Sequence, residues 1–210
     1  MTSDKIPDVV IRRMVTYLRI LREIPKGTKE YVSSSEMGDW AAVNSAQVRK
    51  DLALFGEFGK QGVGYPVEGL TEELVRILGA DRDMPVAVFG IGELGTALVR
   101  YLTARRGSDP KYPFAIAALF DSDPRKIGTK LEDKTIESLD SWEDPGNRKY
   151  VRIALVTVPA HAAQDVADRA MGFGVKGFLN FAPTKLKMPA GVKVLNADVT
   201  LQLQELAYYL

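Results

Sequence analysis

A glycine-rich turn that begins only after some eighty-five residues constrains this chain more than any other feature. Residues 86–95 read VAVFGIGELG. The uninterrupted apolar start is typical of a buried parallel strand. Gly90, Gly92 and Gly95 supply the spacing GxGxxG, and a helical apolar stripe follows. The stripe comprises Leu94, Ala97, Leu98, Tyr101 and Leu102. The segment predicts a strand, turn and helix that bind a pyrophosphate at the helix N-terminus.

A second apolar strand ends in an acidic residue. Residues 114–120 read FAIAALF, and the carboxylate of Asp121 behind them could accept hydrogen bonds from an adenosine ribose. The interval from Gly90 exceeds the usual spacing of about 20 residues. We expect an extended loop over residues 105–113 to absorb the difference. An acid here favours NAD over NADP, although two basic residues close behind weaken that preference. A Rossmann-type sheet that binds no nucleotide is the alternative.

Composition bounds the remaining possibilities. The chain has 210 residues, is 46% hydrophobic and 26% charged, and is long enough for two domains. It contains no cysteine, which excludes disulfides, thiol nucleophiles and thiolate zinc sites. The first residues lack a signal-peptide pattern and no apolar run could span a membrane, so we expect a cytoplasmic protein. The net charge of +1 means that any DNA contact must come from local arrangement.

The first segment begins with an amphipathic helix and a capped second helix. An apolar stripe at helical spacing ends before Pro25 and Gly27. Ser33, followed three residues later by Glu36, is the signature of a capping box and predicts a helix that starts at Ser34. The first stripe comprises Ile11, Met14, Val15, Leu18 and Leu21.

A third helix is predicted in the segment SAQVRKDLALFG, which starts at residue 45. Val48, Leu52 and Phe55 fall on one face, and Arg49 and Lys50 point away from it. In a helix-turn-helix the second helix enters the major groove, where basic side chains reach base edges and phosphates. The alternative is an ordinary solvated face.

A glycine-tipped hairpin is predicted in the next segment, GEFGKQGVGY, with Lys60 and Gln61 near its tip. Helix, helix, turn, helix and hairpin is the order of a winged helix-turn-helix, whose wing lies along a minor groove. Thr71 is expected to cap a helix over residues 72–78. We place a winged-helix DNA-binding domain at residues 1–80.

The rest of the chain alternates strands and helices. We expect a strand at 151–158, a helix at 160–173 and a strand at 175–181, which predict an α/β fold with a doubly wound, Rossmann-type parallel sheet over residues 81–196. Ligands gather at the carboxyl ends of such strands. The residues expected around the nicotinamide are Thr157, Val158, Pro159, Asn180, Phe181 and Ala182, of which Val158 and Phe181 could equally be plain core.

A terminal helix is predicted over residues 197–210. It is apolar on more than one face, and therefore needs more cover than one sheet domain provides. Its apolar residues are Val199, Leu201, Leu203, Leu206, Tyr208 and Leu210. A second subunit could cover the helix by exchange around a two-fold axis. A helix folded against its own domain is the alternative.

The ordered set of motifs resembles the Rex family of redox-sensing transcriptional repressors. The motifs are VIRRMVTYLRIL, SSSE, QVRKDLALFGEFGKQGVGY, GIGELG, FDSDPRKIG, VTVPAHAAQ, GVKGFLNFAP and LQLQELAYYL, and together they cover essentially the whole chain. The resemblance implies a homodimer that binds an inverted-repeat operator, expected to be A·T-rich, when NADH is scarce. It also implies release from the operator when NADH binds, with NAD+ as a weaker competitor.

Site residues follow from the motifs and the resemblance together. The predicted cofactor contacts at the turn are Gly90, Ile91, Gly92, Glu93, Leu94, Gly95, Asp121 and Ser122. The predicted operator contacts are Arg12, Ser45, Ala46, Gln47, Arg49, Lys50, Lys60 and Gln61. The resemblance further implies that Arg19, Tyr101 and Asp198 take part in interdomain coupling. Glu93 departs from the pattern because its charge would oppose a pyrophosphate, and we expect it to point outward.

Two other functions share parts of this pattern. An NAD-dependent oxidoreductase with an N-terminal extension is the main alternative, but His161 is the only histidine and no carboxylate nearby in sequence would orient it. We therefore predict no catalytic residues, no enzyme activity and no metal site. A coenzyme A binding module shares the glycine turn, but it would not explain the wing.

Overall fold

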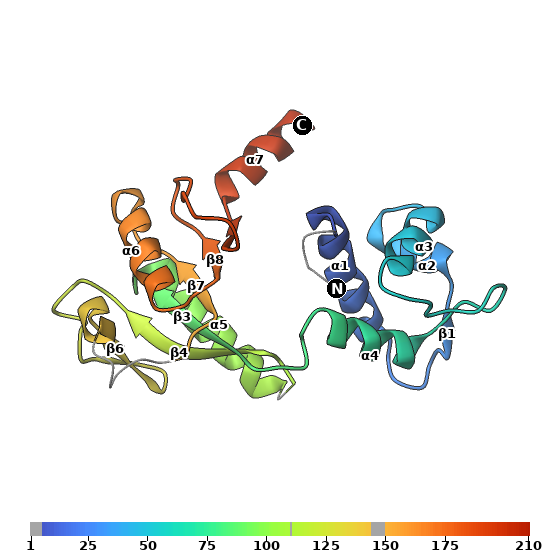
Figure 1. The fold of residues 1–210 in the computed structure, drawn as a ribbon, viewed down its shortest axis with the longest axis horizontal. Coiled ribbons are helices and arrows are strands. Elements are labelled where there is room, and N and C mark those ends of the chain that lie inside the picture. The colour runs from blue at the N-terminus through green and yellow to red at the C-terminus, as the bar shows by residue number, and fades with distance from the viewer. Residues whose placement is uncertain (1–5, 110, 144–149) are drawn as a thin grey trace. The chain divides into compact units, whose positions relative to one another are not determined.

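The computed structural model describes residues 6–109, 111–143 and 150–210, and it divides the chain into two units, Met1–Arg82 and Asp83–Leu210 (Figure 1). The first unit holds helices α1 (Asp8–Glu23), α2 (Ser34–Ala41), α3 (Ser45–Ala53) and α4 (Val67–Ile77). It also holds a small antiparallel sheet of β1 (Tyr31–Val32) and β2 (Tyr65–Pro66). Its described core combines residues of all four helices.

The capping box of α2 is confirmed. The Ser33 hydroxyl accepts a hydrogen bond of 3.1 Å from the Glu36 N–H, and the Glu36 carboxylate accepts one of 2.9 Å from the Ser33 N–H. The predicted stripe of α1 is partly wrong, because Ile11 and Val15 are exposed. Tyr17 is buried in their place, and its hydroxyl is satisfied inside the unit.

Two further expectations for this unit are corrected. Helix α4 begins at Val67, not at residue 72, and the Thr71 hydroxyl donates back to the Val67 carbonyl at 2.6 Å instead of capping the helix. Pro66, with its fixed φ, occupies the N-cap position, and the helix begins five residues earlier than expected. The predicted hairpin is reduced to a single bridge between Lys60 and Gly64, and β2 pairs with β1.

The second unit is built on a seven-stranded sheet in the order β5-β6-β4-β3-β7-β8-β9. The strands are β3 (Met84–Phe89), β4 (Phe114–Phe120), β5 (Lys130–Leu131), β6 (Lys134–Glu137), β7 (Ile153–Val156), β8 (Gly177–Asn180) and β9 (Lys193–Asn196). All pairs are parallel except β5 with β6. Chain order reverses direction at β3 and β7, as in a Rossmann sheet, and the predicted fold class is confirmed.

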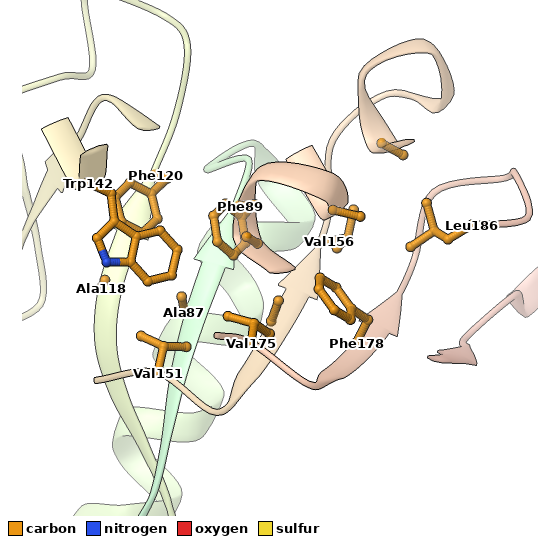
Figure 2. Packing of buried hydrophobic residues seen from close by; sticks show 14 of the residues in the cluster. Ala87, Phe89, Ala118, Phe120, Trp142, Val151, Val156, Val175, Phe178 and Leu186 are labelled. Carbon is orange, nitrogen blue, oxygen red and sulfur yellow. The ribbon is translucent and has the colours of Figure 1, made fainter. Parts of the chain in front are cut away.

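Helices cover both faces of this sheet. On β3, Val86 and Val88 pack with the core under α5 (Glu93–Ser108), whereas Ala87 and Phe89 belong to the core under α6 (Ala160–Gly172). The second core contains an aromatic stack, in which Trp142 lies with its ring centroid 4.9 Å from that of Phe120 (Figure 2). Trp142 belongs to a short 3-10 helix, Leu139–Glu143.

Helix α5 differs from its prediction in length and in phase. It continues through Ser108, so residues 105–108 are helical and the loop expected over residues 105–113 is shorter. Arg106 anchors this last turn by donating to the Tyr112 carbonyl at 2.9 Å and to the Asp83 carboxylate. Leu94 and Tyr101, expected on the buried stripe, are 47% and 63% exposed. The buried side of the helix carries Gly95, Leu98, Val99 and Leu102 instead.

The last helix, α7 (Val199–Tyr208), has no buried residue. Asp198 caps it by accepting hydrogen bonds from the N–H groups of Thr200 and Leu201, at 2.9 and 3.3 Å. Its apolar side chains are exposed, and the alternative of a helix folded against its own domain finds no support here. Within the described ranges, the helices are too short or too polar to cross a membrane.

Candidate functional site

The glycine turn joins β3 to α5, and at two of its three glycines neighbouring atoms leave no room for a side chain. A Cβ on Gly95 would lie 2.0 Å from the Gly90 carbonyl oxygen, and one on Gly90 would lie 2.8 Å from a Val158 methyl group. Gly90 also has a φ of +93°, which side chains rarely adopt. Gly92, at the N-cap of α5, has nothing within 4 Å of such a Cβ. Open space therefore lies over the turn where a pyrophosphate would approach the helix N-terminus.

Thr157 ties the turn to the neighbouring strand β7. Its N–H donates to the Phe89 carbonyl at 2.9 Å, and its hydroxyl donates to the Gly90 carbonyl at 2.7 Å. Strands β3 and β7 flank the point where strand order reverses, and ligands of open α/β sheets bind outside the carboxyl ends of the strands at this point. The predicted position of the cofactor site thus coincides with the topological switch point of the sheet.

Asp121 lies at the end of β4, and the protein itself uses both of its carboxylate oxygens. One accepts from the Ile91 N–H at 2.7 Å and from the Lys126 ammonium at 3.1 Å, and the other accepts from the Asp123 N–H at 2.8 Å. The side chain is 9% exposed. Burial acts to raise the pKa of this carboxyl group, but the two N–H groups and Lys126 outweigh it and hold the pKa below its usual value. Contact with a ribose stays a prediction.

A hollow of about 570 Å³ opens beside the turn. It is lined by Ile91, Gly92, Glu93, Thr96, Ala97, Arg100 and Lys126. Two cations and one acid thus surround the space, which suits an anionic ligand. Glu93 is exposed and contributes to the lining, so its outward orientation stays a prediction. Arg100 and Thr96 were not predicted, although they follow Gly92 at steps of four residues along α5.

The remaining cofactor candidates lie at the ends of β4, β7 and β8, with different exposure. Ser122 and Pro159 are exposed, Thr157, Val158 and Phe181 are half-buried, and Ala182 is buried in the core. Asn180 is 1% exposed. Its side-chain amide donates to the Ala182 and Thr184 carbonyls and to Asn196, and its oxygen accepts from the Ala182 N–H. This network organises the end of β8, and its contact with a cofactor stays a prediction.

In the first unit, several predicted operator residues surround one groove. A hollow of about 430 Å³ lies between α2, α3 and the Lys60 turn. Arg49, Lys60 and Gln61 contribute to its lining, and Arg49 donates to the Ser34 hydroxyl at 2.9 Å. Lys50 is exposed on α3 but does not line the groove. The structure therefore brings the basic residue of the helix and the turn to one surface.

The other predicted operator residues are less uniform. Arg12 is exposed on α1, Ala46 is exposed on α3, and Ser45 and Gln47 are half-buried. The Gln47 amide donates to Asp51 at 2.7 Å. Asp51 was not predicted, although it stands three residues after Val48 within the apolar stripe of α3, and an acid at such a position is a signal that the sequence contains.

Of the three residues assigned to interdomain coupling, one lies in the first unit and two lie in the second. Arg19 is on α1 and pairs with Glu23 at 3.4 Å. Tyr101 is exposed on α5, and Asp198 caps α7. Their joint role stays a prediction. His161 is exposed near the start of α6, and the described residues contain no group of three or more possible ligands placed to hold a metal ion.

Comparison with known proteins covers both units. A family model described as "Putative DNA-binding protein N-terminus" matches residues 5–53, and one described as "CoA binding domain" matches residues 81–184. The redox-sensing transcriptional repressor Rex of Roseiflexus sp. (strain RS-1) is 46% identical over 204 residues, which are 97% of this chain and 90% of the relative.

Solved structures agree with this relationship. A crystal structure of RSP in complex with NAD+ and operator DNA has a TM-score of 0.87 and 34% identity, covering 97% of this chain and 92% of that one. A structure of RSP in complex with NADH has a TM-score of 0.84 and 32% identity, covering 98% and 94%. Identity at this level along nearly the full length shows that the chain belongs to the Rex family of redox-sensing transcriptional repressors.

Proposed function

We propose that this chain represses transcription by binding operator DNA through residues 1–80, and that NADH bound to residues 81–196 releases it. The main support for the proposal is the glycine turn. Neighbouring atoms leave no room for a side chain at Gly90 and Gly95, whereas the space at Gly92 is free and lies beside two cations. The RSP relative has been solved both with NAD+ and operator DNA and with NADH, which supports both ligands.

The dinucleotide would lie across the switch point of the sheet. Its pyrophosphate would approach Gly92 and the N-terminus of α5, with its adenosine towards Asp121 and its nicotinamide towards Thr157. NADH and NAD+ differ at the nicotinamide, which is neutral in one and cationic in the other. NADH can lower operator affinity only by its differential affinity for the two protein conformations, and each tenfold ratio corresponds to about 1.4 kcal/mol.

The operator would be read by α3 in the major groove and by the Lys60 turn in the minor groove. Arg49 and Lys50 supply exposed cations on α3. A second copy would cover residues 197–210, which include α7. The resulting two-fold symmetry matches an inverted repeat whose halves lie whole helical turns apart.

A binding experiment tests these statements together. Full-length protein is titrated against an A·T-rich inverted-repeat duplex and a scrambled duplex at one fixed salt concentration, with NADH, NAD+ or coenzyme A present. We expect selective binding to the inverted repeat and its loss with NADH at lower concentration than with NAD+. Unchanged operator binding at saturating NADH, or release by coenzyme A alone, would overturn the proposal. Oxidation of NADH by added carbonyl compounds would support the oxidoreductase.

A further inference from the structure

Asp51 is a buried carboxylate that the proposed function does not use. It lies on α3 and is 1% exposed. Arg13 of α1 donates to it twice, from Nε at 2.5 Å and from Nη2 at 2.8 Å, to opposite oxygens. The Tyr17 hydroxyl, also on α1, donates at 2.9 Å, and Gln47 donates at 2.7 Å from the preceding turn of α3. Three of these four hydrogen bonds join the reading helix to the first helix, and the fourth lies within α3.

A buried ion pair such as Asp51 with Arg13 does not by itself show that the pair stabilises the protein. Removing two charges from water is costly, and apolar residues of similar volume often stabilise a protein as well or better. Burial acts to raise the pKa of Asp51, but Arg13, Gln47 and Tyr17 outweigh it and hold the pKa below its usual value, so the charge is retained. An ion pair made of two parallel hydrogen bonds restricts the relative orientation of the two side chains, because a guanidinium donates two parallel bonds to a carboxylate in only a few arrangements.

The orientation of Asp51 also determines where the neighbouring side chains of α3 point. Successive residues of a helix are rotated by roughly 100°. With Asp51 fixed towards α1, the two preceding residues, Arg49 and Lys50, must point away from the core, and both are exposed. Rotation of α3 about its axis would move both cations relative to a bound duplex.

We propose that Asp51 is a positioning residue for operator discrimination, which fixes the rotation of α3 against α1 through Arg13 and Tyr17. The inference rests on the proposed function of α3 as the helix that reads the operator. Base edges are read through a few directional hydrogen bonds, whereas phosphates attract any nearby cation. Loss of the network should therefore reduce discrimination between sequences far more than it reduces general affinity for DNA.

The test compares full-length variants on operator and scrambled duplexes over a series of salt concentrations. For Asp51→Asn we expect the ratio of the two dissociation constants to fall about tenfold or more, as for loss of one good base contact. The scrambled-duplex affinity, the salt slope and the NADH affinity should stay unchanged. Tyr17→Phe removes one of the four hydrogen bonds, and we expect a smaller fall in the same ratio.

Two control variants test whether a fall in the ratio comes from the lost charge or from lower stability instead of from the position of α3. Asp39→Asn makes the same charge change at an exposed site of the same unit, and Leu74→Val trims the buried core at a residue of α4 outside the four hydrogen bonds to Asp51. Both should keep the wild-type ratio. An equal fall in either one would overturn the inference, and so would a wild-type ratio in folded Asp51→Asn.

If Asp51→Asn does not fold, Tyr17→Phe decides, because a wild-type ratio in that variant overturns the inference. A wild-type protein that shows no preference for the operator would instead refute the proposed function, so the two failures are distinguishable.

Discussion

The carboxylate of Asp121 accepts a hydrogen bond of 2.7 Å from the backbone N–H of Ile91, thirty residues earlier in the chain. One acidic side chain at the end of β4 therefore fixes the shape of the glycine turn at the end of β3. Lys126 pairs with the same oxygen and also lines the hollow beside the turn. The position expected to bind a ribose is thus also a structural part of the turn proposed to bind the pyrophosphate.

Replacing Asp121 with Ala should weaken NADH binding by about 1–3 kcal/mol, because hydrogen bonds to a charged group are lost and the Ile91 N–H loses its partner. Operator affinity without NADH should be unchanged. Titration calorimetry with NADH and a duplex-binding assay measure the two effects. Wild-type NADH affinity in this variant would show that the carboxylate matters neither for the turn nor for the ribose.

Replacing Gly92 with Ala should reduce NADH affinity at least about tenfold, or about 1.4 kcal/mol, with little change in melting temperature. The added methyl group meets no protein atom within 4 Å and occupies the space proposed for the pyrophosphate. Gly107→Ala is the control, since its methyl group on the same helix is also unobstructed. Equal NADH affinity in the two variants would place the pyrophosphate elsewhere.

Replacing Gly95 with Ala should destabilise the second unit itself. The new methyl group would lie 2.0 Å from the Gly90 carbonyl oxygen, so α5 must shift away from β3. Overpacking of this kind costs typically 1–3 kcal/mol, and denaturant unfolding measures the loss. A Gly95→Ala protein as stable as wild type would mean that the helix and strand separate without strain.

Replacing Arg49 with Ala should lower operator affinity by about 1–3 kcal/mol if its guanidinium contacts a base, and should leave NADH affinity unchanged. Fluorescence anisotropy with a labelled duplex measures the effect. Arg76→Ala, on the exposed side of α4, provides the control for loss of one positive charge. Equal losses in the two variants would reduce the role of Arg49 to general attraction.

Glu36 makes the stability of the first unit depend on pH. Hydrogen bonds from Lys29 and from Ser33 lower the pKa of its carboxyl group from its usual 4.5 to about 2. A lowered folded-state pKa stabilises the protein above the unfolded value, and the contribution disappears as the pH falls from about 4.5 towards 2. Glu36→Gln should be less stable than wild type at pH 7 by up to roughly 1 kcal/mol, because Gln can still accept the Ser33 N–H but loses the partly exposed ion pair with Lys29. Urea unfolding at pH 7 and pH 3 should show this difference shrinking, and a constant difference would contradict the assignment.

The sequence predicted those elements whose ends carry local signals. The bounds of β4 are confirmed because an apolar run stops at Asp121, and the start of α2 is confirmed because Ser33 and Glu36 form a reciprocal pair. Helix phase was harder to predict. Gly95 occupies the buried side of α5 without any side chain to signal it, so the exposed Tyr101 was assigned to the stripe instead.

The candidate sites show the same division. The glycine spacing located the turn, since it is a local motif, and it located Asp121 through the strand that precedes it. The partners of that carboxylate are tertiary, because nothing in the local pattern joins Ile91 to residue 121. The sequence shows that Asp51 interrupts the apolar stripe of α3, but it does not show that the partner is Arg13, thirty-eight residues earlier in the chain.

The proposed pairing of two chains through helix α7 would link repression to the abundance of the protein. It exposes all its apolar side chains on a single chain, and a second copy is proposed to cover them. Association between identical chains depends on concentration by mass action. The fraction of chains that are paired, and can therefore bind both halves of an operator, rises with the number of chains in a cell. A gene controlled in this way responds to how much regulator has been synthesised as well as to its nicotinamide pool.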